Sequence, residues 1–302
     1  ALHDRGFEEI MPPILDALPK IENPTLKDPL KVAIVGRPNV GKSSYINRLL
    51  RHERVIVSDV PGTTRDSIDV PFSVGKGEQA RHYLLIDTAG MRRIGKIDSS
   101  VERFSRFRAE KSIARADIAI LVMDATAGPT AQDKKIAALI EEHRKGGIII
   151  VNKWDLSETT QKQYLPALLR AIPFMEYCPV VFLSAKSGFN IRRSVDAIDY
   201  VAAQVSKTLP TGILNRAILD AYERISPQSV KGKRLNILYS TQVGTEPLRI
   251  RLFVNNPRLV QPNYRRYLER KLREKFGLEG APVILEFRPR PKSEKPARAG
   301  RS

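Results

Sequence analysis

The segment GRPNVGKS, residues 36–43, has glycines at positions 36 and 41, and a lysine and a serine directly after the second. Between a strand and a helix, a loop of this spacing lets backbone N–H groups surround phosphate oxygens, which the helix dipole also favours. Lys42 is expected to reach the β- and γ-phosphates, and the Ser43 hydroxyl to bind Mg²⁺. The predicted phosphate-binding residues are Gly36, Arg37, Pro38, Asn39, Val40, Gly41, Lys42, Ser43 and Ser44.

A second segment, DTAG at residues 87–90, ends another apolar run. Its Asp87 is placed to contact Mg²⁺ through a water molecule, and the Gly90 N–H to meet the γ-phosphate. Thr88 and Ala89 complete this predicted nucleotide-binding segment. An ordinary strand-end turn is the alternative, which a preceding phosphate loop disfavours.

The segment PGTTRD, residues 61–66, supplies a further hydroxyl. A Thr here is expected to complete the Mg²⁺ shell beside a γ-phosphate, and Thr64 is preferred to Thr63. Met91, directly after DTAG, raises a difficulty, because a thioether cannot orient an attacking water through a strong hydrogen bond. Either this protein does not hydrolyse its nucleotide, or another group holds the water.

The segment NKWD, residues 152–155, can select a purine base. Asp155 can accept hydrogen bonds from the ring N–H and the exocyclic amine of guanine, and adenine lacks that amine. Asn152 is expected at the base edge, and the stem of Lys153 across the base face. Trp154, the only tryptophan, is therefore expected to report nucleotide binding by its fluorescence.

The segment SAK contributes Ser184, Ala185 and Lys186 after the next apolar run. The Ala185 N–H is expected to donate to guanine O6, so that polar groups which only guanine satisfies reject adenine. Alone, SAK is an ordinary loop, but in this order after the other motifs it predicts a P-loop GTPase.

The 302-residue chain is 42% hydrophobic and 28% charged, which is typical of a globular protein large enough for two domains. Its longest apolar run falls short of the roughly 18 residues of a membrane span, and one cysteine excludes a disulfide framework. The net charge is +18, and residues 206–302 hold 21 Lys and Arg against 8 Asp and Glu. This asymmetry favours a polyanion as the partner of the C-terminal part, with a merely solubilising charge as the alternative.

Short apolar runs alternate with helix-like stretches along residues 31–207. Near-continuous apolar runs are typical of strands buried on both faces, so the pattern predicts an α/β domain with a mostly parallel sheet between helices. The expected strands are 31–35, 84–87, 118–124, 147–153 and 179–185, with a hairpin within 66–87. The expected helices are 42–50, 99–115, 130–144, 159–171 and 191–207.

The order then changes to helix, strand, strand, helix and strand, which predicts a small α+β domain at residues 208–289. Its expected elements are helix 213–226, strands 233–240 and 248–255, helix 263–276 and strand 282–288. Residues 290–302 are basic and poor in apolar side chains, so a disordered tail is expected there.

GRPNVGKS, PGTTRD and DTAGMRR together resemble the motifs of Era-like GTPases. The segments RLNILYSTQVGTEPLRIRLFVNNPRL and YRRYLERKLREKFGLEGAPVILEFRPR resemble the C-terminal KH-like domain of the Der (EngA) family. The resemblance implies GTP hydrolysis with Mg²⁺ and a switch in large-subunit ribosome biogenesis. The implied partner is RNA or protein of a 50S-type subunit or its precursor, bound by a monomer in the bacterial cytoplasm or, alternatively, in an organelle stroma or matrix.

That family carries two GTPase domains, whereas this chain holds one complete set of motifs. Its start, ALHDRGFEEIMPPILDAL, is similar to AKSGFNIRRSVDAIDYV at 185–201, since each has a polar turn, Gly-Phe and an amphipathic helix. Residues 1–30 are therefore expected to hold the last helix of a preceding GTPase domain, at 3–18, and a linker. An unrelated N-terminal helix is the alternative.

The resemblance also implies a substitute for the missing glutamine. Several Era-like members with an apolar residue after DTAG place K⁺ where other GTPases receive an arginine finger, and an Asn at the fourth loop position is its ligand. That position is Asn39, with an ordinary loop residue as the alternative. A cation there would stabilise charge that develops on the phosphates. Arg65, Arg92 and Arg93 are finger candidates that are more simply solvated or partner-facing.

The second domain offers candidate RNA-phosphate contacts, with a solvated basic face as the alternative. These candidates are Lys233, Arg234, Arg265, Arg266, Arg270, Lys271 and Arg273. The buried side of their helix is indicated by the helical spacing of Tyr264, Tyr267, Leu268, Leu272 and Phe276. GLEG at 277–280 spells the KH nucleotide clamp but joins a helix to a strand, so Gly277 is expected to be a helix C-cap.

Two rival functions remain. A tRNA-modification GTPase of the same branch would carry a helical domain and a C-terminal Cys, neither of which the sequence contains. A non-hydrolysing nucleotide-binding scaffold is favoured only by Met91, and a turnover measurement separates it from the enzyme.

Overall fold

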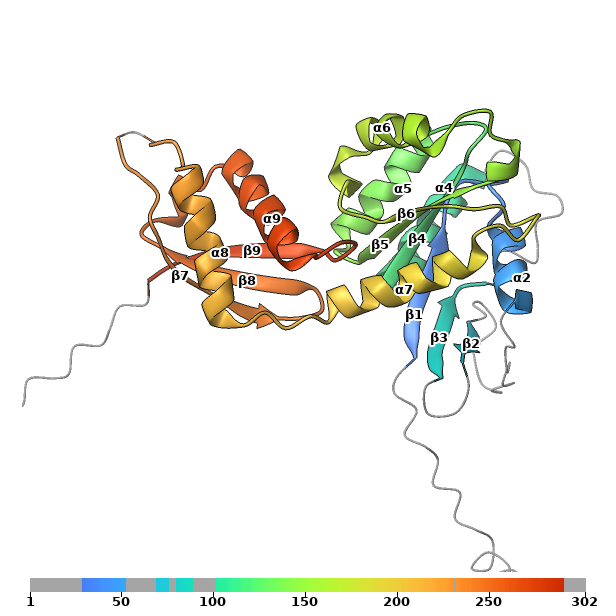
Figure 1. Cartoon of the computed structure of the whole chain (residues 1–302), viewed down its shortest axis with the longest axis horizontal. Helices are drawn as coiled ribbons and strands as arrows, with labels where there is room; N and C mark the ends of the chain where they lie inside the picture. Colours follow the sequence, from blue (N-terminus) through green and yellow to red (C-terminus); the bar gives the residue numbers. More distant parts are fainter. Residues whose placement is uncertain (1–28, 53–68, 76–79, 89–100, 231, 291–302) are drawn as a thin grey trace, which may run out of the picture.

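The computed structural model describes residues 29–52, 69–75, 80–88, 101–230 and 232–290, and for residues 52 and 101–106 it describes the backbone alone. These residues form an α/β domain and a smaller α+β domain (Figure 1). All of PGTTRD lies outside the described residues, as do the expected N-terminal helix, the linker up to residue 28 and the C-terminal tail from residue 291. Among the residues described, no helix is long and apolar enough to cross a membrane.

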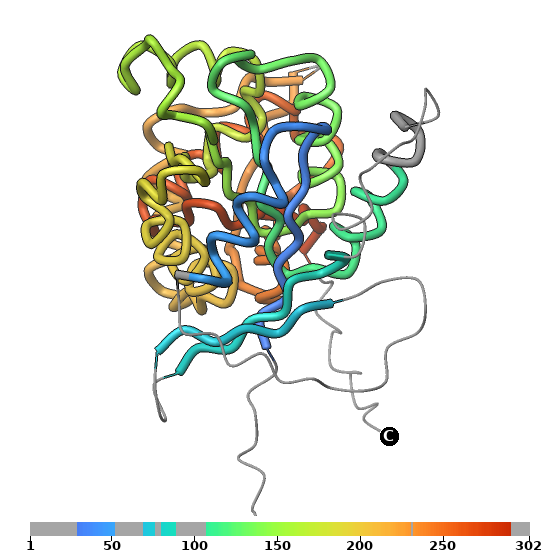
Figure 2. The backbone as a smooth tube through the Cα atoms, turned by 90° about the vertical axis from the view of Figure 1, so that its right-hand side faces the viewer, coloured from blue at the N-terminus to red at the C-terminus, as the bar shows by residue number. Residues whose placement is uncertain are grey.

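The first domain is built on a six-stranded sheet of order β2-β3-β1-β4-β5-β6. Only β2 runs antiparallel to its neighbour, and Figure 2 shows it beside β3 at the edge of the sheet. The bounds are β1 Leu30–Val35, β2 Val70–Val74, β3 Arg81–Ile86, β4 Ile118–Asp124, β5 Gly146–Asn152 and β6 Val180–Phe182. The predicted mostly parallel sheet is confirmed, although β6 is shorter than expected because the chain turns at SAK, where Gly188 donates to the Ser184 carbonyl.

Helices cover both faces of this sheet, as its continuous apolar strands require. Successive strand residues point to opposite faces: Ile118 and Ile120 join the core under α2 and α7, whereas Ala119 and Leu121 join the core under α4, α5 and α6. The helices are α2 Lys42–His52, α4 Val101–Arg115, α5 Ala131–Glu142, α6 Gln161–Ala171 and α7 Ile191–Val205, with short 3₁₀ turns η2 Trp154–Leu156 and η3 Pro173–Met175.

The second domain packs two helices on a three-stranded sheet of order β7-β8-β9 (Figure 1). Its elements are α8 Thr211–Arg224, β7 Ile237–Gly244, β8 Leu248–Val254, η4 Pro257–Leu259, α9 Pro262–Phe276 and β9 Val283–Pro289. The predicted element order is confirmed, but β7 begins four residues later than expected because Val230 and Lys233 pair with each other in a turn. The predicted buried side of α9 is confirmed for Tyr264, Tyr267, Leu268 and Leu272, and Phe276 is partly buried against the same core.

A docking loop, residues 277–281, joins the second domain to the sheet of the first. The Gly147 N–H at the start of β5 donates to the Gly280 carbonyl at 2.8 Å, and the Gly280 N–H donates to the Tyr177 carbonyl at 2.7 Å. Gly277 caps α9 with φ 63°, which confirms the predicted C-cap. The motif that spells a nucleotide clamp therefore makes an intramolecular contact, and one hydrophobic core runs through both domains.

Candidate functional site

The phosphate loop lies between β1 and α2, at the carboxyl end of the central strands. Gly36 has φ +151°, and a Cβ there would lie 2.3 Å from the Val122 carbonyl oxygen. Gly41 has φ +92°, and a Cβ there would lie 2.3 Å from Asn152 Nδ2. Both glycines are therefore needed for the close approach of the loop to β4 and to the base motif. Asn39, the predicted K⁺ ligand, has φ 63°.

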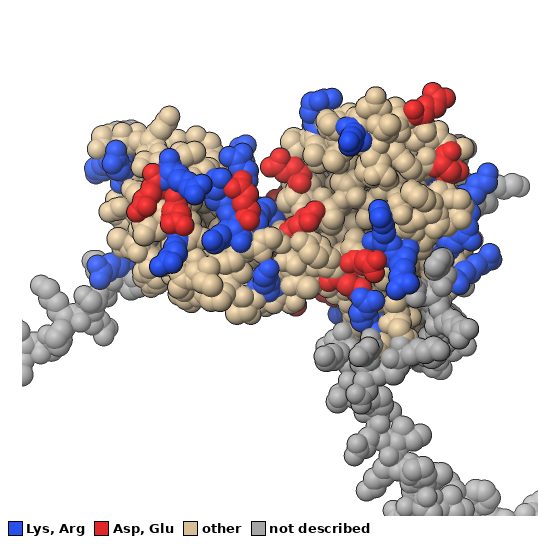
Figure 3. Space-filling model, viewed as in Figure 1, with Lys and Arg blue, Asp and Glu red and all other residues tan. Residues whose placement is uncertain are grey.

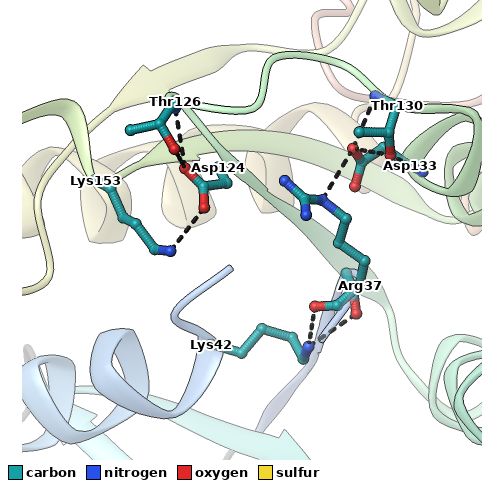
Figure 4. Close-up of polar contacts among 8 residues, drawn as sticks. Arg37, Lys42, Asp124, Thr126, Thr130, Asp133 and Lys153 are labelled. Atoms are coloured by element: carbon teal, nitrogen blue, oxygen red, sulfur yellow. Dashed lines mark hydrogen bonds and ion pairs between the residues drawn. The ribbon is translucent and has the colours of Figure 1, made fainter. Parts of the chain in front are cut away.

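Lys42 holds its ammonium group against the same loop (Figure 4). Its Nζ donates to the carbonyls of Gly36 at 2.8 Å and Arg37 at 2.7 Å. Burial lowers the pKa of Lys42 to about 8; the negative charge of Asp133 acts in the opposite sense. The ammonium thus lies against the loop that the sequence predicts to bind the β- and γ-phosphates.

Asn152 joins the phosphate loop to the SAK segment. It is buried, its Nδ2 donates to the Val40 carbonyl at 2.8 Å, and its Oδ1 accepts the Ala185 N–H at 3.0 Å. Both groups of the amide are engaged with protein, so Asn152 fixes the geometry of two ligand-facing loops. The sequence placed Asn152 at the base edge and the Ala185 N–H on guanine O6; in the structure these two groups bond to each other.

The base motif follows β5 as a left-handed residue and a 3₁₀ turn. Lys153 has φ 61°, and its Nζ lies 2.7 Å from Asp124 Oδ2, which orients the lysine stem (Figure 4). The Asp124 Oδ1 atom accepts from the N–H and the hydroxyl of Thr126 at 3.0 and 2.7 Å. Burial raises the pKa of Asp124, but the hydrogen bonds from Lys153 and Thr126 outweigh it and the net shift is downward.

Asp155 and Trp154 lie in η2, which follows that residue. The Asp155 side chain is exposed, as a carboxylate that receives a ligand requires. Trp154 packs edge-on against Phe182 and Tyr164, with ring centroids 4.5 and 5.6 Å away. Its use as a reporter of nucleotide binding stays a prediction.

The SAK segment forms a turn that leaves one predicted residue exposed and buries the others. Ser184 Oγ accepts the Ser187 N–H at 3.1 Å, and Ser184 and Ala185 are buried. Lys186 is exposed, and its carbonyl accepts a hydrogen bond from Arg48 of α2 at 2.7 Å. The turn is therefore tied to α2, the helix that begins with Lys42.

Asp87 and Ser43 are the described candidates for Mg²⁺ ligation. Asp87 follows β3 with φ 56°, and its Oδ2 accepts from Ser112 Oγ at 3.2 Å; Ser43 is half-buried in the first turn of α2. One hydroxyl and one carboxylate leave the other positions to phosphate oxygens and water, which suits Mg²⁺. Among the described residues no group of three His, Cys, Asp or Glu side chains could hold a metal by itself.

Thr88 is buried next to Asp87. Several other predicted residues lie outside the described residues, namely Thr63, Thr64, Arg65, Ala89, Gly90, Met91, Arg92 and Arg93. Pro38 and Val40 belong to the phosphate loop, and Ser44 is exposed on the first turn of α2.

Four residues near the site carried no motif signal. Asp124 pairs with Lys153, and Asp133 with Arg37, each a basic residue of a recognised motif. Thr126 donates a hydrogen bond to Asp124. Asp69 accepts the Asp87 N–H at 2.9 Å and pairs with Arg115 on α4. The one available signal was position, since Asp124 is the last residue of the apolar strand β4 and Asp69 directly precedes β2.

The candidate RNA-binding residues fall into two groups. Lys233, Arg234, Arg266 and Arg270 are exposed on the second domain, where Figure 3 shows Lys and Arg gathered with some Asp and Glu among them. Three of the candidates also contact protein groups: Arg265, likewise exposed, donates to the Leu285 carbonyl at 2.6 Å, and Lys271 and Arg270 lie 2.6 and 3.8 Å from Glu274.

Arg273 departs from the prediction. Its guanidinium lies 3.8 Å from the centroid of the Tyr177 ring and donates to the carbonyls of Leu278 and Ala281. Burial lowers the pKa of Arg273, and the nearby Tyr177 acts in the opposite sense. This side chain holds the docking loop against the first domain, so it is a correction to the set of free phosphate contacts.

Two family models match the chain in the order of its domains. Residues 31–153 match a 50S ribosome-binding GTPase, and residues 208–288 match the KH-domain-like C-terminal domain of EngA bacterial GTPase enzymes. The chain is 44% identical over 288 residues to GTPase Der of Caldanaerobacter subterraneus, covering 94% of this chain and 65% of that protein. It is 47% identical over 266 residues to GTPase Der of Desulforudis audaxviator, covering 87% and 60%.

A crystal structure of Aquifex aeolicus Era bound to GDP.AlF4- has a TM-score of 0.42 and 21% identity, over 85% of this chain and 91% of that one. The chain spans 65% or less of the length of the two relatives above. Both domain matches and identity above 40% along most of the sequence agree with the motifs in the folded site. The chain belongs to the Der family of GTPases, with a GTPase domain followed by a KH-like domain.

Proposed function

We propose that this chain binds GTP with Mg²⁺ and hydrolyses it to GDP and phosphate. The observation that carries the proposal is Asn152, which ties the phosphate loop to the SAK turn through hydrogen bonds of 2.8 and 3.0 Å. Groups that read the phosphates and groups that read the base are thereby held in one rigid unit, as recognition of a whole nucleotide requires.

The phosphate half of the site supplies positive charge and backbone donors. Lys42 exchanges its contacts with the Gly36 and Arg37 carbonyls for phosphate oxygens, while the N-terminus of α2 faces the same oxygens. Ser43 and Asp87, with Thr64, would hold Mg²⁺, and the ion would supply positive charge against the phosphates. The Gly90 N–H and the loop donors keep the γ-phosphate in line with the attacking water.

The base half selects guanine through Asp155. Its exposed carboxylate accepts the two guanine donors, while the contact with Asp124 sets the Lys153 stem against the base face. For the Ala185 N–H to reach guanine O6, it must share or leave its bond to Asn152. Adenine would leave the Asp155 carboxylate without its partners, a loss that discriminates strongly between the two bases.

Asn39 is the proposed ligand of K⁺, and the ion is proposed to compensate for the missing catalytic glutamine. The test is GTP turnover in KCl and in NaCl at equal ionic strength, with Asn39→Ala beside the parent chain and Asn190→Ala as a control. Asn190 has a similar left-handed backbone, with φ 58°, at the start of α7. We expect faster turnover in K⁺ that Asn39→Ala abolishes and Asn190→Ala keeps.

Equal turnover in both salts would refute the K⁺ mechanism and direct attention to Arg65 or Arg92. No turnover in either salt, with GDP still bound, would favour the non-hydrolysing scaffold. Failure of GDP to bind at all would refute the nucleotide site itself.

The KH-like domain is proposed to dock on ribosomal RNA or protein of a large-subunit precursor in the bacterial cytoplasm, or in an organelle, with the chain as a monomer. Support comes from the exposed cations Lys233, Arg234, Arg266 and Arg270 and from the description of the matched GTPase family as 50S ribosome-binding. Co-sedimentation with large-subunit particles in the presence of GDP or a non-hydrolysable GTP analogue tests it. Binding that is absent with both nucleotides would refute the proposal.

A further inference from the structure

The side chain of Arg37 extends away from Lys42 and toward Asp133 (Figure 4). Its carbonyl accepts the Lys42 ammonium at 2.7 Å, whereas its guanidinium extends to Asp133 in the first turn of α5. The side chain is only 20% exposed, and that of Asp133 is fully buried. A charged pair with so little solvent is sensitive to small changes in geometry.

Asp133 is held in place from its other side by Thr130, the N-cap of α5. The Asp133 Oδ2 atom accepts from the Thr130 N–H at 3.0 Å and from its hydroxyl at 2.7 Å, and Thr130 Oγ1 accepts the Asp133 N–H at 3.3 Å. All of these carboxylate contacts use Oδ2. The second oxygen, Oδ1, is buried and has no hydrogen-bond partner.

The geometry between Arg37 and Asp133 is that of an incomplete pair. Nε lies 3.6 Å from Oδ2, beyond the range of about 2.7–2.9 Å for a charge-assisted hydrogen bond. Nε and Nη2 of Arg37 are both buried without a hydrogen-bond partner. These two nitrogens lie on the same side of the guanidinium and match the two oxygens of a carboxylate. Shortening the distance between Nε and Oδ2 by about 1 Å would bring it into hydrogen-bond range, and a two-bond fork would give all three unpartnered atoms a partner.

We propose that Arg37 is a positioning residue whose guanidinium closes into a two-bond fork with Asp133 when the phosphate loop holds GDP or GTP. The proposal rests on the proposed nucleotide site. A bound phosphate draws the Lys42 ammonium away from the Arg37 carbonyl, which frees the backbone that carries the guanidinium. Because Asp133 is fixed in the α5 cap, the closed fork then holds the loop around the phosphates.

The test compares release of fluorescent N-methylanthraniloyl-GDP from the parent chain, Arg37→Lys, Asp133→Asn and the double variant. Arg37→Lys keeps the positive charge and the α5 cap but cannot form the fork. Arg144→Lys is the matched control. Arg144 lies just after the C-terminal end of α5, away from the site, and pairs with Glu141 in the last turn of that helix. Thermal unfolding is measured for every variant with and without GDP.

We expect Arg37→Lys to release GDP roughly 10- to 100-fold faster, the range for hydrogen bonds to charged groups, while Arg144→Lys changes nothing. Asp133→Asn is expected to add little to Arg37→Lys in the double variant, because both remove the same fork. Arg37→Lys should lower the unfolding temperature of the GDP-bound chain more than that of the chain without GDP.

Unchanged GDP release in Arg37→Lys would overturn the inference, as would equal losses of stability with and without GDP, which indicate a purely structural pair. If Asp133→Asn does not fold, Arg37→Lys decides the matter alone. A parent chain that binds no GDP would refute the proposed function, and the inference with it, which distinguishes that outcome from failure of the fork.

Discussion

Gly280 is the residue of the docking loop on which a single added methyl group should have the largest effect. It has φ +74°, and a Cβ there would lie 2.4 Å from Val201 Cγ2 and 3.0 Å from the Gly147 carbonyl oxygen. Val201 belongs to α7 and Gly147 to β5, so the strain falls on the contact between the two domains. We therefore consider Gly280→Ala, which adds one methyl group and no charge.

The expected cost has two parts. An L-residue in the left-handed region costs about 1–2 kcal/mol, and overpacking a well-packed contact costs about 1–3 kcal/mol. Together they predict a loss of roughly 2–5 kcal/mol in the free energy of unfolding, a large share of the ~5–15 kcal/mol of a typical domain. If the loop withdraws instead, it loses the hydrogen bonds to Tyr177 and Gly147 and a comparable free energy.

Gly277→Ala is the matched control at the other end of the same loop. Gly277 has φ +63°, but no heavy atom lies within 4 Å of a Cβ built on it. Gly277→Ala therefore carries the cost of a left-handed backbone but not the cost of overpacking. The difference between the two variants, about 1–3 kcal/mol, therefore measures the overpacking at the domain contact alone.

Urea unfolding followed by Trp154 fluorescence gives the stability, and reaction of Cys178 with a disulfide-exchange reagent reports opening of the contact. Cys178 follows Tyr177, is 4% exposed, and burial raises the pKa of its thiol well above the usual range, so reaction requires opening. We expect Gly280→Ala to react roughly 5- to 150-fold faster than Gly277→Ala. Equal unfolding midpoints and equal thiol reactivity in the two variants would refute the steric account of the docking loop.

Three further predictions concern the ligand sites. Asp155→Asn replaces an acceptor by a donor facing the guanine N–H groups, so GTP affinity should fall roughly 100-fold and xanthosine triphosphate should bind in preference; unchanged preference in a competition assay would exclude Asp155 from base recognition. Ser43→Ala removes an Mg²⁺ ligand, so EDTA should accelerate GDP release from the parent chain and not from the variant; equal acceleration would place Mg²⁺ elsewhere. Arg266→Ala should lower the slope of log affinity for RNA against log salt by about 1, while Arg258→Ala, outside the candidate set, should not; equal slopes would remove Arg266 from the contact surface.

Much of the fold follows from local patterns in the sequence. The run IAILVMD predicts a strand at 118–124, and β4 spans those residues because both of its faces are covered by helices. Glycines at 36 and 41 predict a phosphate loop after a strand, and both adopt backbone angles that favour glycine. The α-β-β-α-β order likewise predicts the KH-like domain, with an error of four residues at β7.

The contacts of individual side chains could not be predicted in this way, because they join residues that are distant in the sequence. Arg273 resembles its basic neighbours on α9, and only the packed structure places its guanidinium over Tyr177, 96 residues earlier. Asn152 fits a base-recognition motif, but its burial between Val40 and Ala185 depends on how two loops meet.

Local sequence therefore determined the elements, their order and the chemistry of the motifs, since periodicity and turn residues act over a few positions. The tertiary structure alone decided that Asp133 receives Arg37 and that Gly280 of GLEG bonds to Gly147 and Tyr177 of the first domain. Those choices depend on which surfaces close packing brings within about 4 Å, a property that no short segment contains.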